Sequence, residues 1–468
     1  MSSASSGSIP LSPHEKLWNE TNPVVDALDT IVAQYFLADN LQRTSLGDGA
    51  YGRAFLYNLN NGHQAVAKVI LPVRPVFKTE GEVGAMLLVK EKTSIPVPDV
   101  YLYCSSANNP VRAEWIIMQY LPGKRFIDCF EDLPAEKRYQ TATDLARIIS
   151  SIFTITASYC GSVLPDNRLN PLRYPGLPLS NRSKTGLETL KWEQKDDIHS
   201  GFLQAGVMDP LSGLSIGPIN DAVLLYYPNQ IPHEQCGPFS SEKECLVAFL
   251  SLTFPRPTGI LERDSVARLL EVLDLAKKHE QRRFSLLNTE VFHFAHGDLH
   301  AANILIDPAT GAVTGIIDWE MAGFRPAWLA AVASEWFNDD RRYFATEEAR
   351  SLSECSLDNE SFEDQRLRAF FRLQMWKNNE LLFRCNWLGR ESRGFFGCGC
   401  NSKDWWAESW LLVYEERFWE TSRRGSFPFD ITTWLLWRME QHKLLDTPPT
   451  PTSPTDKPST PMSPTDNP

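Results

Sequence analysis

Apolar and polar positions in the first third of the chain follow the pattern of β-strands. Residues 41–46 lead into a glycine cluster, and apolar, β-prone runs follow at 54–59 and 64–71. Asn60-Asn61-Gly62 separates these two runs, and an Asn-Gly step in that position is a strong hairpin signal. A small sheet is therefore predicted, completed by two further runs at 99–103 and 114–118.

Helical periodicity replaces the strand pattern at residues 79–92 and becomes dominant after residue 122. Val83 and Leu87 recur at helical spacing, and Ile95-Pro-Val-Pro98 ends this first helix because proline blocks its continuation. Beyond residue 122 the pattern predicts helices at 144–156, 262–280 and 366–440. The chain thus combines a small sheet carrying one helix with a larger, mainly helical region.

Composition excludes two broad classes of protein. At 468 residues, with 43% hydrophobic and 22% charged positions, the chain can bury a large core, so it is not intrinsically disordered as a whole. Its 46 Lys and Arg against 58 Asp and Glu give a net charge of −12. This balance argues against a nucleic-acid partner, because counterion release needs clustered cations.

The termini and cysteines predict a soluble, cytoplasmic protein with no membrane partner. The N-terminus has no basic stretch followed by an apolar one, and no apolar run approaches the roughly 18 residues of a membrane-spanning helix. Nine scattered cysteines fit reduced thiols better than a disulfide framework. The oligomeric state stays open.

The first candidate motif is the glycine-rich stretch with Gly47, Gly49 and Gly52. A dinucleotide-binding fold would need a helix directly after it, whereas a β-hairpin is predicted here. This order favours a loop that covers the phosphates of a nucleotide, as in kinases. An ordinary tight turn is the alternative.

The second candidate is Lys68, which lies midway along an apolar predicted strand. A lysine is seldom buried without a partner, so its ammonium group needs an anion. Glu82 on the following helix is the expected partner, and Glu80 is the alternative because the helix phase is not fixed. A solvated lysine on an exposed strand face would explain the pattern without function.

The third motif is His296-Gly-Asp298-Leu-His-Ala-Ala-Asn303, followed by Ile316-Ile-Asp318-Trp-Glu320. An Asp and an Asn five residues apart on a tight loop can accept a hydroxyl proton and bind a metal ion, respectively. A turn at 307–311 joins two apolar runs, so Asp318 is expected beside Asn303. Unrelated surface carboxylates are a poor explanation for these spacings.

Together these motifs resemble the aminoglycoside phosphotransferase-like enzymes, over roughly residues 40–125 and 290–340. The resemblance implies an α+β, bilobal protein-kinase-like fold, with a small N-lobe sheet carrying one helix and a large, mainly helical C-lobe. The expected organisation is an N-terminal extension (1–35), the N-lobe (36–121), the C-lobe (122–445) with an insertion near 161–242, and a disordered Ser/Thr/Pro-rich tail (446–468).

The resemblance also implies a role for each matching residue. Asp298 would orient or deprotonate the acceptor hydroxyl, and Asn303 and Asp318 would hold Mg²⁺. Lys68, positioned by Glu82, would bind the α- and β-phosphates of ATP beneath the three glycines. The adenine would meet the backbone of a hinge formed by Gln119, Tyr120 and Leu121.

The resulting hypothesis is an ATP- and Mg²⁺-dependent phosphotransferase that acts on a hydroxyl of a small molecule, with amine-bearing acceptors as candidates. A non-catalytic kinase-like scaffold and a protein kinase are the alternatives. Gly297, where protein kinases have arginine, counts against the latter.

Two residue groups have simpler explanations than ligand binding. His293, His296 and His300 lack the further ligands of a zinc site, and His296 is expected to hold the catalytic loop through hydrogen bonds. Eleven of the 14 tryptophans lie at or after Trp319, where packing explains them better than a cage for a cationic ligand.

Overall fold

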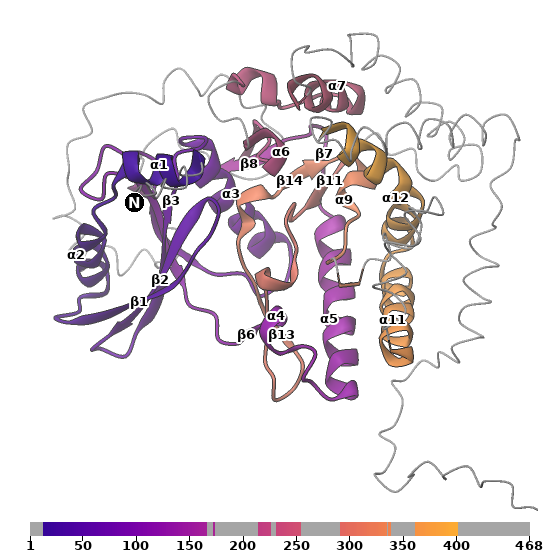
Figure 1. Cartoon of the computed structure of the whole chain (residues 1–468), viewed down its shortest axis with the longest axis horizontal. Helices are drawn as coiled ribbons and strands as arrows, with labels where there is room; N and C mark the ends of the chain where they lie inside the picture. The colour runs from indigo at the N-terminus through magenta and orange to yellow at the C-terminus, as the bar shows by residue number, and fades with distance from the viewer. Residues whose placement is uncertain are drawn as a thin grey trace, which may run out of the picture.

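A computed structural model describes residues 13–165, 172–173, 214–225, 231–253, 291–334, 336–337 and 361–400 (Figure 1). The predicted helix at 262–280, the tail at 446–468 and the last part of the predicted helical segment at 366–440 lie outside these residues. The described elements form the α+β structure that the sequence predicts, with an N-terminal sheet followed by a mainly helical part.

The N-terminal part is built on an antiparallel sheet in the order β1-β2-β3-β5-β4-β9. The hairpin predicted at Asn60–Gly62 joins β2 to β3, and the predicted runs at 99–103 and 114–118 become β4 and β5 with shifts of one residue. The strands are β1 (Leu41–Asp48), β2 (Gly52–Leu59), β3 (Gln64–Ile70), β4 (Val100–Cys104), β5 (Glu114–Gln119) and β9 (Leu172–Arg173).

Strand alternation sends neighbouring side chains of this sheet into two separate cores. In β3, Ala65, Ala67 and Val69 face a core formed with α1 (Pro13–Thr21) and α2 (Val25–Phe36). Ile70 faces the opposite core, formed with α3 (Phe77–Lys92), which begins two residues before the predicted start. Lys68 lies two residues before Ile70 in β3, so its side chain points to the same face of the sheet, toward α3.

The C-terminal part is mainly helical, with three short sheets inserted between the helices. The predicted helix at 144–156 is longer in the structure, because α5 (Ala135–Phe153) begins directly after Pro134. It lies beside α11 (Phe362–Asn378) (Figure 1). The remaining helices and turns are α4 (Phe126–Cys129), α6 (Ala222–Leu225), η4 (His233–Cys236), α7 (Glu242–Thr253), η5 (Ala301–Asn303), η6 (Trp319–Met321), α9 (Ala327–Ala330), α11 (Phe362–Asn378) and α12 (Glu380–Cys400).

The short sheets hold the motif loops. One sheet pairs β11 (Phe292–Ala295) with β14 (Gly323–Arg325) and β7 (Thr156–Ala157). A second pairs β12 (Ile304–Ile306) with β13 (Val313–Ile316) and β6 (Lys124–Arg125). A third, inside the predicted insertion, pairs β8 (Ser162–Pro165) with β10 (Leu214–Gly217). The loop that carries Asp298 and Asn303, predicted to be catalytic, therefore runs from the end of β11 to the start of β12.

Tryptophan packing is confirmed for Trp319, which is fully buried and donates from its indole nitrogen to the Ile316 carbonyl at 3.0 Å. No helix among the described residues is both long and apolar enough to cross a membrane.

Candidate active site

Lys68 reaches its position because Gly52 leaves room for its stem. A β-carbon at Gly52, the first residue of β2, would come within 2.8 Å of the Lys68 Cε. Lys68 Nζ donates to both carboxylate oxygens of Glu82, each at 3.0 Å. Glu80, the alternative partner, instead accepts from the Ser105 hydroxyl at 2.8 Å. The helix phase of α3 thus directs Glu82 to the lysine.

Asp318 meets the same ammonium group from 250 residues further along the chain. It follows β13 in a left-handed backbone conformation with φ 66°, which turns its carboxylate toward the N-terminal sheet. Lys68 Nζ lies 2.6 Å from Asp318 Oδ1. The Asp318 side chain remains 35% exposed, so its carboxylate also faces solvent.

Two further charged residues belong to this site, and the sequence reasoning did not place them there. Glu320 Oε2 accepts from Lys68 Nζ at 2.8 Å and from Lys78 Nζ at 2.5 Å. Lys78 is only 1% exposed, and its ammonium also lies 5.5 Å from the centre of the Tyr51 ring in the glycine loop. A signal was available, since Lys78 precedes Glu82 by one helical turn and therefore shares its face.

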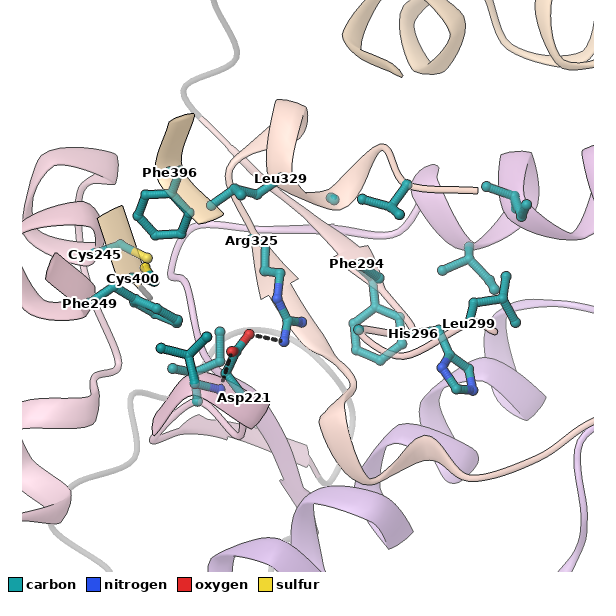
Figure 2. A pocket seen from close by; sticks show the side chains of 18 residues that line it. Asp221, Cys245, Phe249, Phe294, His296, Leu299, Arg325, Leu329, Phe396 and Cys400 are labelled. Atoms are coloured by element: carbon teal, nitrogen blue, oxygen red, sulfur yellow. Dashed lines mark hydrogen bonds and ion pairs between the residues drawn. The ribbon is translucent and has the colours of Figure 1, made fainter. Parts of the chain in front are cut away.

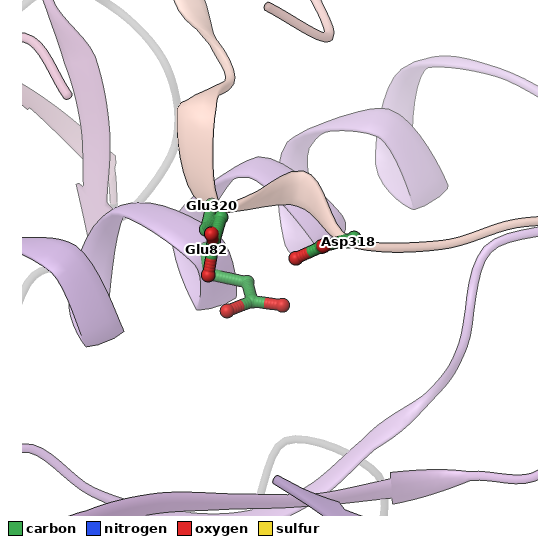
Figure 3. A group of neighbouring side chains, drawn as sticks. All are labelled: Glu82, Asp318 and Glu320. Atoms are coloured by element: carbon green, nitrogen blue, oxygen red, sulfur yellow. The ribbon is translucent and has the colours of Figure 1, made fainter. Parts of the chain in front are cut away.

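Three carboxylates and two ammonium groups share this small volume. Glu82, Asp318 and Glu320 have ligand atoms within 4.8 Å of one another (Figure 3). Burial by itself lowers the pKa of Lys68, but the charges of Asp318, Glu320 and Glu82 outweigh burial and hold this pKa well above its usual value. Lys68 is therefore charged, and its ammonium, with that of Lys78, already neutralises most of the cluster.

The carboxylates respond to this environment in opposite directions. Burial raises the pKa of Glu82, and the nearby Asp318 and Glu320 carboxylates raise it further. Burial also acts to raise the pKa of Asp318, but Lys68 outweighs it and keeps this pKa below its ordinary value. Asp318 thus stays ionised, as a metal ligand must. On acidification, Glu82 takes up a proton before Asp318 does.

The loop at residues 296–303 is fixed by hydrogen bonds among its own residues and to Ile317, which directly follows β13. Asn303 Nδ2 donates to the Asp298 carbonyl at 2.8 Å. The Asp298 amide donates to His296 Nδ1 at 3.3 Å, which leaves His296 Nε2 to donate to the Ile317 carbonyl at 3.0 Å. Burial lowers the pKa of His296 to about 4, so the ring is neutral at pH 7. The expected structural role of His296 is confirmed.

The three histidines do not gather around a common point. His293 Nδ1 lies 2.7 Å from the Phe153 carbonyl, and its ring stacks on Phe153. His300 Nε2 instead lies 3.5 Å from Asp298 Oδ2, at the surface of the loop.

Asn303 and Asp318 have the donor chemistry that Mg²⁺ prefers. Asn303 Nδ2 donates to the Asp298 carbonyl, and within the described residues no hydrogen bond uses Asn303 Oδ1, which leaves this oxygen available as a ligand. The Ile317 amide donates to the Asn303 carbonyl at 3.0 Å, which ties the two loops together beside Asp318. The residues present therefore fit a hard cation at the exposed side of Asp318.

The glycine loop and the predicted hinge at residues 119–121 lie at opposite ends of the sheet's central strands. The Gly49 amide donates to the Gly52 carbonyl at 2.8 Å, which closes the turn between β1 and β2, and Gly47 has a positive φ of 145°. At the other end, β5 stops at Gln119, and the Leu121 side chain packs against Gly315 in β13. Tyr120 lies between them and is half-buried.

Comparison with known proteins gives one family. Residues 233–374 match the model of the phosphotransferase enzyme family, and this span contains Asp298, Asn303 and Asp318. The resemblance predicted from the motifs is confirmed. The rest of the chain lies outside the matched span, so the match to this family rests on residues 233–374.

Individual relatives are distant. A subtelomeric hrmA-associated cluster protein of Aspergillus fumigatus is 23% identical over 363 residues, which cover 70% of this chain and 67% of the relative. Among solved structures, the aminoglycoside phosphotransferase APH(4)-Ia with AMP-PNP and hygromycin B is 14% identical, with a TM-score of 0.40, over 86% of this chain and 99% of its own. A putative aminoglycoside phosphotransferase of Ralstonia eutropha is 13% identical, with a TM-score of 0.43, over 86% and 99%.

Proposed function

We propose that this protein is an ATP- and Mg²⁺-dependent phosphotransferase that moves the γ-phosphate to a hydroxyl of a small molecule, with amine-bearing acceptors among the candidates. The observation that carries the proposal is the convergence of Lys68, Glu82 and Asp318 beside Asn303 and Asp298. These side chains come from distant parts of the chain, and each has the chemistry that phosphoryl transfer requires.

In the proposed mechanism the protein mainly positions reactants and balances charge. Lys68, held by Glu82, neutralises phosphate oxygens, while Gly47, Gly49 and Gly52 allow backbone amides to approach the triphosphate. Asp298 accepts the proton of the acceptor hydroxyl.

Asn303 and Asp318 would hold Mg²⁺, which supplies further neutralisation of the phosphate charge. Gln119, Tyr120 and Leu121 would offer backbone groups to the base. Lys78 keeps Glu320 neutralised when Lys68 turns to the nucleotide.

The two alternatives differ in what they need from the chain. A non-catalytic scaffold does not need Lys68, Asp298, Asn303 and Asp318 together, so their joint presence favours turnover. A protein kinase of the usual type would have arginine at Gly297, and here the Arg325 guanidinium occupies the adjacent space, 3.0 Å from where a β-carbon would lie. That arrangement supports a small-molecule acceptor.

The test separates nucleotide binding from transfer. We expect MgATP at a hundred times its Kd to stabilise the wild type by about 2.7 kcal/mol, seen as a rise in Tm. Asp318→Ala should weaken this rise, and Asp298→Asn should keep it while abolishing ADP release with acceptors. The exposed Asp128→Asn serves as matched control. A wild type that gains no stability from millimolar MgATP would refute the proposal.

A further inference from the structure

A cavity of about 190 Å³ lies between the loop that carries Asp298 and the helices α7, α9 and α12 (Figure 2). His296, Gly297 and Leu299, the neighbours of Asp298 in the loop, form one end of its wall. Phe249 of α7 and Phe396 of α12 close the opposite end, and Phe294 of β11 lies between (Figure 2). One end of a molecule in this cavity would therefore contact Gly297 and Leu299, the residues on either side of Asp298 in the sequence.

The wall is apolar and close to electrically neutral. Among the described residues that line it, the only carboxylate is Asp221, and its Oδ2 accepts from Arg325 at 3.1 Å. Arg325 also donates to the Met321 carbonyl at 2.8 Å and is 6% exposed, so this pair is fixed in the protein. His296, the one imidazole among the described lining residues, is neutral, and the remaining lining side chains are aliphatic, aromatic or thiol.

We propose that this cavity receives the acceptor, and that the acceptor is an alcohol with an apolar body and at most one charged group. The inference rests on the proposed function, whose acceptor class it narrows. A polycationic acceptor would need carboxylates to replace its lost hydration, and Asp221, the one carboxylate among the described lining residues, is already paired with Arg325. An alkyl or aromatic body instead gains from leaving water.

The size of the cavity sets the size of the acceptor. At about 190 Å³ it is smaller than the roughly 300–1,000 Å³ of sites for drug-sized ligands. A single ring or a short branched chain fits this space. A multi-ring aminosugar does not.

The reaction balances with the groups named. The acceptor oxygen forms a bond to the γ-phosphorus while the bond between that phosphorus and the β–γ bridging oxygen breaks. The electron pair of the broken bond leaves with ADP, and Asp298 takes the hydroxyl proton. The apolar body remains in the cavity, where it holds the hydroxyl near Asp298 and excludes water that would compete for the phosphoryl group.

The experiment uses the full chain with MgATP and two sets of probes. The apolar set is 3-phenylpropan-1-ol, cyclohexylmethanol and 1-hexanol, and the polycation is streptomycin. We measure the rise in Tm with MgADP present and ADP release with MgATP present. We expect at least one apolar alcohol to bind and to be phosphorylated, with kcat/KM at least tenfold above that of streptomycin.

Two variants locate the binding. Ala330→Leu fills the cavity, since Ala330 is buried in its wall, and should weaken binding of the apolar alcohol at least tenfold. Leu329→Ala enlarges the cavity and should shift preference toward the larger probe. Both variants should keep the rise in Tm with MgATP, which shows that they fold.

The outcomes separate the two proposals. Phosphorylation of streptomycin alone, with no response to the three alcohols, would overturn the apolar acceptor while leaving the phosphotransferase in place. Equal alcohol binding by wild type and Ala330→Leu would also overturn it, because the site would then lie elsewhere. Absence of any MgATP response in the wild type would overturn the proposed function and this inference with it.

Discussion

Glu114 is a buried acid whose replacement should stabilise the protein. It lies in β5 and is 4% exposed. Its Oε1 accepts from the Val76 amide at 2.8 Å, and its Oε2 hydrogen-bonds the Thr79 hydroxyl. Burial raises the pKa of Glu114 to about 7, although both hydrogen bonds and Lys78 act to lower it and Glu80 raises it further. The ionised form is therefore unfavourable in the folded state.

The magnitude follows from linkage. Between pH 4.5 and about 7 the folded protein retains a proton at Glu114 that the unfolded chain has lost, so stability falls as pH rises. The difference corresponds to about 3 kcal/mol by pH 8. Glu114→Gln removes this loss. Its carbonyl oxygen can still accept from Val76, and its amide can donate to Thr79, whose hydroxyl then acts as acceptor.

The assay is urea unfolding at pH 5, 6, 7 and 8, followed by circular dichroism. We expect Glu114→Gln to match the wild type at pH 5 and to exceed it increasingly toward pH 8, with an unchanged m value. Glu244→Gln is the control. This exposed carboxylate has its pKa lowered by hydrogen bonds from Ser240, so its contribution to stability is constant above about pH 4.5 and is lost only below it. The Glu244→Gln protein should therefore run parallel to the wild type from about pH 5 to 8. A Glu114→Gln protein that is less stable at pH 8, or parallel to the wild type across the range, would refute the reasoning.

Three further predictions concern the site. Lys78→Met leaves Glu320 with Lys68 alone, so it should destabilise the protein by about 1–3 kcal/mol and raise the KM for MgATP, measured against the exposed Lys90→Met. Gly297→Ala should cost at least about 1–3 kcal/mol in urea unfolding, because φ is +81° and the new β-carbon would lie 2.1 Å from the Met321 carbonyl oxygen. His296 should titrate near pH 4 by NMR, since burial lowers its pKa to about 4. A lowered histidine pKa means that the unfolded chain binds the proton first, so this group makes stability fall as pH drops from 6.5 toward 4. A His296 titration near 6.5 would contradict the buried, neutral ring.

The elements of the N-terminal sheet could be predicted because their signals are local. The Asn-Gly turn, the strand alternation and the prolines after Ile95 each act within a few residues, and the structure places the hairpin and α3 where these signals put them. The helix start at Ala135 was missed because the first turns of α5 are polar and lack apolar periodicity. The packing role of residues 13–36 was missed because it depends on contact with a sheet formed later in the chain.

The sequence by itself determined the chemistry available to the site. It placed Lys68 within an apolar strand, Asp298 and Asn303 on one tight loop and Asp318 after the next strand, because backbone geometry fixes such spacings over short distances.

The tertiary structure alone decided which charges meet. It brought Asp318 and Glu320 to Lys68 across 250 and 252 residues, buried Lys78 against Glu320, and paired Asp221 with Arg325 beside an apolar cavity. In sequence, Glu320, Lys78, Asp221 and Arg325 resemble solvated surface charges. Only the packing of distant elements removes the water that would otherwise separate them, and that desolvation makes their charges matter.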